Sequence, residues 1–147
     1  MHLIRWTLCC WLLLVAGAIS ACAGQPAAPA PLTCHTAYRP SVAVPIERED
    51  TVSLAQPAIE PVTVAYADLV FHAQYLSEPG AGPSLNLFVT LPDQTDRLMS
   101  VLYQLPADRA PANQFVGGHG FTGLHYVYHP ATGAELQFWC VAGDGAQ

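Results

Sequence analysis

Residues 69–105 read LVFHAQYLSEPGAGPSLNLFVTLPDQTDRLMSVLYQL, and this stretch decides the fold class. Apolar side chains recur at every second position in three segments, which is the period of a β-strand with one buried face. Proline and glycine at 79–83, together with residues 92–96, supply turns between the segments. We therefore predict three half-buried antiparallel strands whose inward faces carry Leu69, Phe71, Ala73 and Tyr75, then Leu85, Leu87, Val89 and Leu91, then Met99, Val101, Tyr103 and Leu105.

The end of the chain predicts a β-hairpin. Segments 122–128 and 134–141 flank a turn that begins at Pro130 and ends at Gly133. Proline presets the φ angle of a turn, and glycine adopts the positive φ that closes a bulged hairpin. In this hairpin one face carries Leu136, Phe138 and Cys140, which places the cysteine on the core side.

The spacing of the prolines also favours an all-β fold for the rest of the domain. Ten prolines between residues 40 and 130 interrupt any long helix, and about seven short strands fit between the turns. We predict an all-β domain over residues 34–147, an antiparallel β-sandwich, and an immunoglobulin-like arrangement is one form of such a sandwich. Residues 62–76 leave a helical alternative, because helical spacing relates Ala65, Leu69, His72 and Leu76.

The first 22 residues have the features of a secretory signal. Arg5 supplies a positive charge, and residues 6–19 are almost wholly apolar but short for a membrane span. An aliphatic residue, two small residues and a cysteine follow as Ile19, Ser20, Ala21 and Cys22, and this order resembles the lipobox of bacterial lipoprotein signal peptides. The resemblance covers residues 1–22. It implies removal of residues 1–21 and attachment of a diacylglyceryl group to the Cys22 thiol, often with acylation of the new amine.

The alternative for this segment is an ordinary cleaved signal, or an uncleaved anchor, with a chance cysteine. The lipoprotein interpretation instead places the protein at the cell membrane or outer membrane, held by lipid on Cys22 and facing the extracytoplasmic side. Residues 22–33, rich in proline and alanine, then act as an extended tether between the lipid and the domain.

Charge restricts the class of partner. The chain has five Lys and Arg against eleven Asp and Glu, so removal of Arg5 with the signal leaves a formal charge of 4 − 11 = −7. We expect no nucleic-acid partner, because phosphates require neutralising Lys and Arg side chains. Anionic lipid headgroups also repel an acidic domain, so membrane attachment depends on the lipid.

The cysteines predict a disulfide. Cys9 and Cys10 belong to the signal and Cys22 carries the lipid, so that Cys34 and Cys140 remain to pair with each other. Export places them in an oxidising compartment. We predict a Cys34–Cys140 disulfide that closes about 100 residues, with two buried free thiols as the alternative.

Catalytic motifs are not recognisable in the sequence. It contains no Gly-x-Ser-x-Gly elbow, no helical His pair with an intervening Glu, and no phosphate-binding glycine loop. We expect no cofactor and no metal, and a binding role is favoured over an enzymatic one. The alternative is an extracytoplasmic hydrolase whose carboxylates meet only in the folded chain.

A glycine-rich loop is the candidate ligand contact. Gly117, Gly118, His119 and Gly120 form it, and it extends to Gly123. Glycine permits close approach of a ligand, and His119 brings the only titratable side chain in the loop. A β-bulge or a plain connection is the alternative interpretation.

Two further groups bear on binding. His119, His125 and His129 are candidate metal ligands, but in one strand the last two stand about 13 Å apart, so we expect no metal site. A candidate aromatic platform consists of Tyr126, Tyr128 and Trp139, with core or cross-strand packing as the alternative. We therefore expect a binding or envelope-interaction module whose partner is an unknown envelope protein or small ligand.

Overall fold

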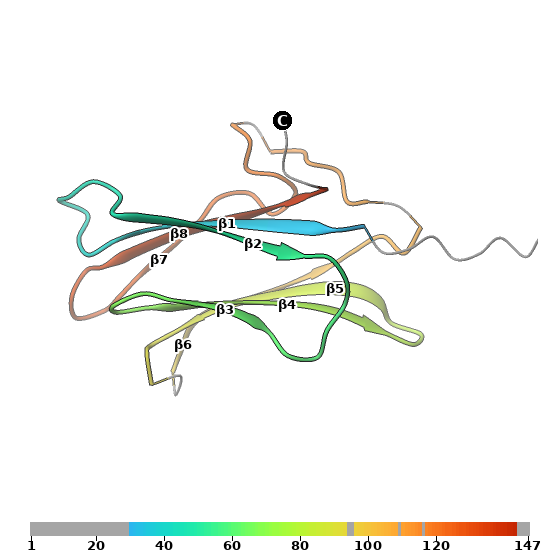
Figure 1. Cartoon of the computed structure of the whole chain (residues 1–147), viewed down its shortest axis with the longest axis horizontal. Coiled ribbons are helices and arrows are strands. Elements are labelled where there is room, and N and C mark those ends of the chain that lie inside the picture. The colour runs from blue at the N-terminus through green and yellow to red at the C-terminus, as the bar shows by residue number, and fades with distance from the viewer. Residues whose placement is uncertain (1–29, 94–95, 109, 116, 144–147) are drawn as a thin grey trace, which may run out of the picture.

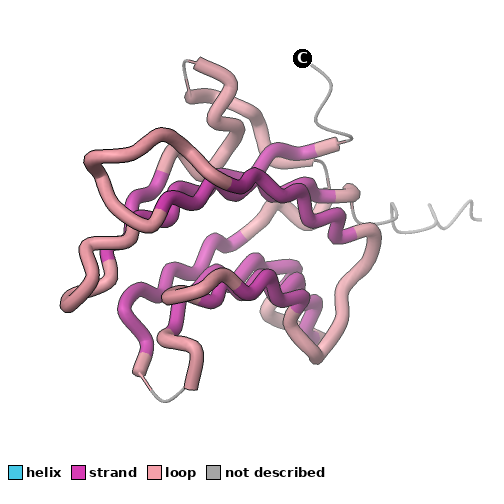
Figure 2. The backbone as a smooth tube through the Cα atoms, turned by 60° about the vertical axis from the view of Figure 1, so that its left-hand side comes forward, coloured by secondary structure: helices cyan, strands magenta, loops and turns pink. Residues whose placement is uncertain are grey.

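The structure is a computed structural model that describes residues 30–93, 96–108, 110–115 and 117–143. These residues form two four-stranded antiparallel sheets that face each other, and Figures 1 and 2 show the two layers. The predicted antiparallel β-sandwich is confirmed. The eight strands of the described residues are β1 (Leu32–Arg39), β2 (Arg48–Leu54), β3 (Val62–Ala65), β4 (Val70–Glu78), β5 (Gly82–Thr90), β6 (Arg97–Gln104), β7 (His125–Tyr128) and β8 (Glu135–Ala142).

The two sheets differ in how the chain builds them. Sheet A has the order β2-β1-β8-β7 and joins the two ends of the domain, so that the blue β1 and the red β8 lie side by side in Figure 1. Sheet B has the order β3-β4-β5-β6, a meander of consecutive strands. Immunoglobulin domains instead distribute their strands as ABED and CFG. The sandwich therefore has a strand order different from the immunoglobulin one.

The core lies between the sheets and is built by the predicted alternation. The inward side chains of β4 and β5 are almost fully buried, with Phe71, Ala73, Leu85, Leu87 and Val89 each 0% exposed. In β6 the inward side chains are only partly buried. The hairpin β7–β8 is also present, and its predicted face of Leu136, Phe138 and Cys140 is 0% exposed.

The helical alternative for residues 62–76 is wrong. This segment contains β3 and the start of β4, which pair in antiparallel register from Val62 opposite Ala73 to Ala65 opposite Val70. The segment forms strands because a period of two buries one complete face, made of Leu69, Phe71, Ala73 and Tyr75. The residues related by helical spacing include Ala65, which is exposed.

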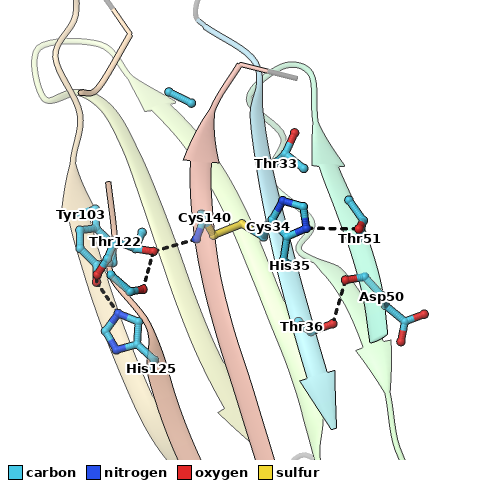
Figure 3. The surroundings of a disulfide bond; sticks show 12 residues. Thr33, Cys34, His35, Thr36, Asp50, Thr51, Tyr103, Thr122, His125 and Cys140 are labelled. Atoms are coloured by element: carbon cyan, nitrogen blue, oxygen red, sulfur yellow. Dashed lines mark hydrogen bonds between the residues drawn. A yellow bond between two sulfur atoms is a disulfide. The ribbon is translucent and has the colours of Figure 1, made fainter. Parts of the chain in front are cut away.

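The Cys34–Cys140 disulfide is present, as predicted. The two cysteines stand opposite each other in register on β1 and β8, with their Cα atoms 4.0 Å apart, and both are buried (Figure 3). The bond links residues 106 positions apart in the sequence. It therefore fastens the first strand of the domain to the last.

The domain begins slightly earlier than residue 34. β1 starts at Leu32, which is 1% exposed, and the Gly143 amide donates to the Pro31 carbonyl. Cys22 and the predicted signal at residues 1–21 lie outside the described residues, as does most of the predicted tether. Within the part of the chain that is described, no helix is long and apolar enough to cross a membrane.

Candidate ligand-binding face

The outer face of sheet A, the side turned away from sheet B, presents aromatic side chains from the hairpin β7–β8. In β7, Val127 points to the core, so its neighbours Tyr126 and Tyr128 point outward. In β8, Trp139 follows the buried Phe138 and is therefore also on the outer face. The strand period alone brings the three side chains of the candidate platform to one surface.

Exposure distinguishes these tyrosines from the others. Tyr126 is 49% exposed and Tyr128 is 51% exposed, whereas Tyr38 and Tyr75 are 4% and 3% exposed. For Tyr126 and Tyr128 the alternative of core packing is therefore wrong. The reason is that both tyrosines point to the outer face of sheet A, whereas Val127 between them points to the core.

Trp139 is held in place by two histidine rings. His35, its register partner on β1, stacks on it with ring centroids 5.2 Å apart and planes at 20°. His119 meets it edge to face, with centroids 5.3 Å apart and planes at 87°. Burial lowers the pKa of His35, which favours the neutral ring in this stack.

An ion pair borders the tyrosines. Arg39 on β1 donates to both carboxylate oxygens of Glu135 on β8, at 3.0 Å from Nε and 2.8 Å from Nη2. Gln137 also donates to Glu135, at 2.7 Å, and Tyr128 hydrogen-bonds to the same carboxylate. The bidentate pair fixes the Arg39 guanidinium on Glu135 beside Tyr128.

The Glu135 carboxylate is buried although it belongs to the outer face. Its residue is 1% exposed. Burial raises the pKa of Glu135, but hydrogen bonds from Arg39, Gln137 and Tyr128 outweigh burial and hold the pKa below its usual value. The carboxylate is thus ionised and fully engaged, which suits a structural support and not a general base.

The glycine-rich loop packs along β8 beside the disulfide. The Phe121 amide donates to the Cys140 carbonyl at 3.1 Å, and the Cys140 amide donates to the Thr122 hydroxyl at 2.7 Å (Figure 3). Gly120, with φ +62°, lies so close that an added Cβ would be 2.0 Å from the Cys140 carbonyl oxygen. Gly120 is therefore required by packing, and it is buried.

The remaining members of the loop lie nearer the surface. Gly117 is exposed, and Gly118 and His119 are partly exposed. An added Cβ on Gly117 would stand 3.3 Å from the His119 ring, so the loop folds closely around that side chain. Through His119 and its contact with Trp139, the loop reaches the same face as the two tyrosines.

Comparisons with known proteins give no match. No family model and no curated protein matches the sequence, and no solved structure matches the fold.

The other two histidines take structural positions. His125 points inward, where its Nε2 hydrogen-bonds to the Tyr103 hydroxyl of sheet B at 2.7 Å and its ring stacks on Phe138 (Figure 3). His129 lies at the turn, where its Nδ1 accepts hydrogen bonds from the Ala131 and Thr132 amides. No group of three or more His, Cys, Asp or Glu in the described residues is arranged to hold a metal ion.

Two aspartates belong to a tyrosine network between the sheets. Tyr38 donates to Asp68 at 2.9 Å and Tyr66 donates to Asp50 at 3.0 Å, while the two rings stack 4.8 Å apart. Burial, assisted by these carboxylates, raises the pKa of each phenol to about 12. The hydroxyls stay protonated near neutral pH and act as donors. Their hydrogen bonds link β1 and β2 of sheet A to the segment between β3 and β4 of sheet B.

Sequence reasoning identified the aromatic trio but missed the residues around it. Nothing in the local pattern marks Arg39 and Glu135 as partners, because 96 positions separate them. His35 escaped notice for the same reason, since its contact with Trp139 follows from the register of β1 and β8. The available signal was the disulfide: once Cys34 pairs with Cys140 in register, His35 must oppose Trp139.

Proposed function

We propose that this protein is a binding module of the cell envelope, anchored on the extracytoplasmic side through lipid on Cys22, and that the outer face of sheet A contacts its partner. Support for the anchor comes from the lipobox resemblance at residues 19–22. Support for the binding role comes from the aromatic face, which we define as Tyr126, Tyr128, Trp139, His35 and His119.

The observation that carries the binding role is the pair of half-exposed tyrosines beside a braced arginine. Tyr126 lies opposite Gln137 and Tyr128 lies opposite Glu135. These alternate rows share one face, so they bring together the phenols, an amide and the Arg39 ion pair. Tyr, Trp and Arg are the residues that most often dominate binding energy at interfaces.

The geometry also lowers the cost of binding. A tyrosine has only two side-chain torsions, and Trp139 and Arg39 are already held by His35 and Glu135. Side chains fixed before binding lose little conformational entropy when a partner arrives. A flat partner with apolar patches and hydrogen-bonding groups fits this surface best, because phenols offer both a ring face and a hydroxyl.

The test is photocrosslinking in intact cells. A photoreactive phenylalanine analogue replaces Tyr126 or Tyr128 in the full-length chain, and the control replaces Ile59, which is 83% exposed in the loop between β2 and β3. We expect adducts with one envelope component at positions 126 and 128 and none at position 59. Equal adducts at all three positions, or none at 126 and 128, would refute the proposal.

A second measurement uses the tryptophan of the aromatic face. The chain contains Trp6, Trp11 and Trp139, so removal of residues 1–21 leaves Trp139 as the sole tryptophan. The crosslinked component, once identified, should change the Trp139 emission of the mature protein on titration. The Tyr126→Ala variant should require at least about tenfold more of that component, as expected for loss of an interface anchor, while Ile59→Ala should titrate like the unsubstituted protein.

A further inference from the structure

The four edge strands of the sandwich differ in how they are protected. Edge strands expose unpaired backbone groups, and proteins guard them with charges, short length or proline. β2 carries Arg48, Glu49 and Asp50 in its seven residues, and β3 and β7 have only four residues each. Each of these three edges therefore has a feature that disfavours pairing with another strand.

The centre of the fourth edge, β6, has neither charged residues nor short length to disfavour such pairing. It has eight residues, and its single charged residue, Arg97, is the first. A register shift opposite Val89 and Thr90 interrupts the ladder near Leu98, and Pro106 follows the strand. Between these two features, residues 99–105 form an uninterrupted segment, and no described strand pairs with its free side.

The hydrogen-bond pattern shows which backbone groups this edge presents. The Leu105 amide donates to the Pro83 carbonyl at 2.9 Å, so position 105 faces β5. Antiparallel ladders alternate between residues that bond to the neighbour and residues whose amide and carbonyl point away. The outward groups are accordingly those of Ser100, Leu102 and Gln104.

Apart from the polar Ser100 and Gln104, the side chains along this edge are apolar or aromatic and incompletely covered. Leu102 is 63% exposed on the outer face of sheet B, and Met99, Val101 and Tyr103 on the inner face are only partly buried. Position 102 is also the midpoint of residues 99–105. A strand added here would place a cross-strand side chain against the exposed leucine and against each of its partly buried neighbours.

We propose that this edge pairs with the same edge of a second copy of the chain, β6 antiparallel to β6, about a two-fold axis at Leu102. In that register Leu102 faces its own counterpart, Ser100 faces Gln104, and Val101 faces Tyr103. The outward backbone groups of one copy then meet those of the other, and the two B sheets become one eight-stranded sheet. Such an interface is isologous, because each contact occurs twice.

Repulsion between two copies of the chain is weakest at this edge. The whole chain has a formal charge of −6, so two copies repel each other over most of their surfaces. Residues 98–105 contain no charged side chain, and the pairing keeps the two Arg97 residues at opposite ends. The paired area is small, so the dimer is reversible and its population depends on concentration.

Cysteine crosslinking tests the register in membranes that contain the full chain. With Cys34 and Cys140 bonded to each other, a Leu102→Cys variant adds one thiol, and directly opposed residues lie about 5.5 Å apart between Cα atoms, within disulfide range. The matched control is Thr63→Cys, exposed on β3 at the opposite edge of the same sheet. Mild oxidation should give a reducible dimer with Leu102→Cys and none with Thr63→Cys.

Sedimentation of the purified full chain in detergent provides the second measurement. The unsubstituted protein should show a concentration-dependent monomer–dimer equilibrium, and Leu102→Lys should weaken it at least tenfold while Thr63→Lys leaves it unchanged. Because Leu102 is largely exposed, the lysine variant should keep its melting temperature. Equal crosslinking by both cysteine variants, a strictly monomeric unsubstituted chain, or a Leu102→Cys adduct only with another protein would each overturn the proposal.

Discussion

Removal of the disulfide provides the sharpest test of how this domain is stabilised. Replacing Cys34 and Cys140 by alanine frees two strands that are 106 positions apart in the sequence. The chain-entropy relation for a loop of this length gives a loss of about 4.8 kcal/mol at 25 °C. Measured losses for native disulfides run from about 2 to 5 kcal/mol, so we expect a loss near the top of that range. For a domain of this size, that corresponds to a fall in melting temperature of about 20 °C.

Urea unfolding of the oxidised protein, the reduced protein and the double alanine variant measures this loss. Reduced protein and double variant should agree closely, because both lack the crosslink and differ only by two buried sulfur atoms. The oxidised protein should be more stable than either. A difference between the oxidised protein and the double variant below about 1 kcal/mol would refute the reasoning, since it would mean that the unfolded chain gains little freedom when the ends are released.

Four other predictions concern single positions. Gly120→Ala should destabilise the fold by more than about 3 kcal/mol, because it adds a backbone clash to an unfavourable positive φ, whereas Gly133→Ala, at φ +72° with open space, should cost only about 1–2 kcal/mol on urea unfolding. Burial lowers the pKa of His125 below 6.5, so the free energy of unfolding should begin to fall as the pH drops below that value. Chemical unfolding at pH 8 and at pH 5.5 measures this fall. The fall between the two pH values should be smaller for His125→Gln than for the unsubstituted protein. The lowered pKa of Glu135 adds stability that is present above its usual 4.5 and is lost as the pH falls through the lowered value. Cys22→Ala should abolish metabolic labelling with fatty acid, and retained label would contradict the anchor.

The strands and the core could be predicted because they depend on local pattern. Leu69, Phe71, Ala73 and Tyr75 bury one face at a period of two, and this signal needs no knowledge of their partners. The disulfide could be predicted by elimination among five cysteines. Strand order could not, because the pairing of β1 with β8 brings together residues about 100 positions apart, and no local signal encodes that register.

The candidate face was harder to predict because its character depends on which strands lie at the edges. Tyr126 and Tyr128 have the same local pattern as buried hairpin residues, and they are exposed because they point to the outer face of the edge strand β7. Likewise, the local pattern does not show that His125 points inward and hydrogen-bonds to Tyr103. Once the hairpin is placed in sheet A, the tyrosines must point outward and His125 must point inward, because alternate residues of a strand take opposite faces.

The two proposed surfaces are linked by the geometry of the sandwich. The hydrogen bond from Tyr103 on β6 to His125 on β7 shows that the β6 edge lies on the same side of the molecule as the tyrosines. A two-fold axis through paired β6 strands stands perpendicular to sheet B, so both A sheets lie on one side and both aromatic faces point in one direction. The dimer would therefore bind a repeating envelope surface at two points. Two linked binding sites raise the avidity of the dimer even though each site makes the same contacts as in the monomer. Leu102→Lys should then weaken retention on isolated envelopes, in a sedimentation assay, much more than it changes the Trp139 titration with the single soluble component. An equal effect on both would mean that Leu102 acts on the single contact itself, and it would refute the two-point attachment.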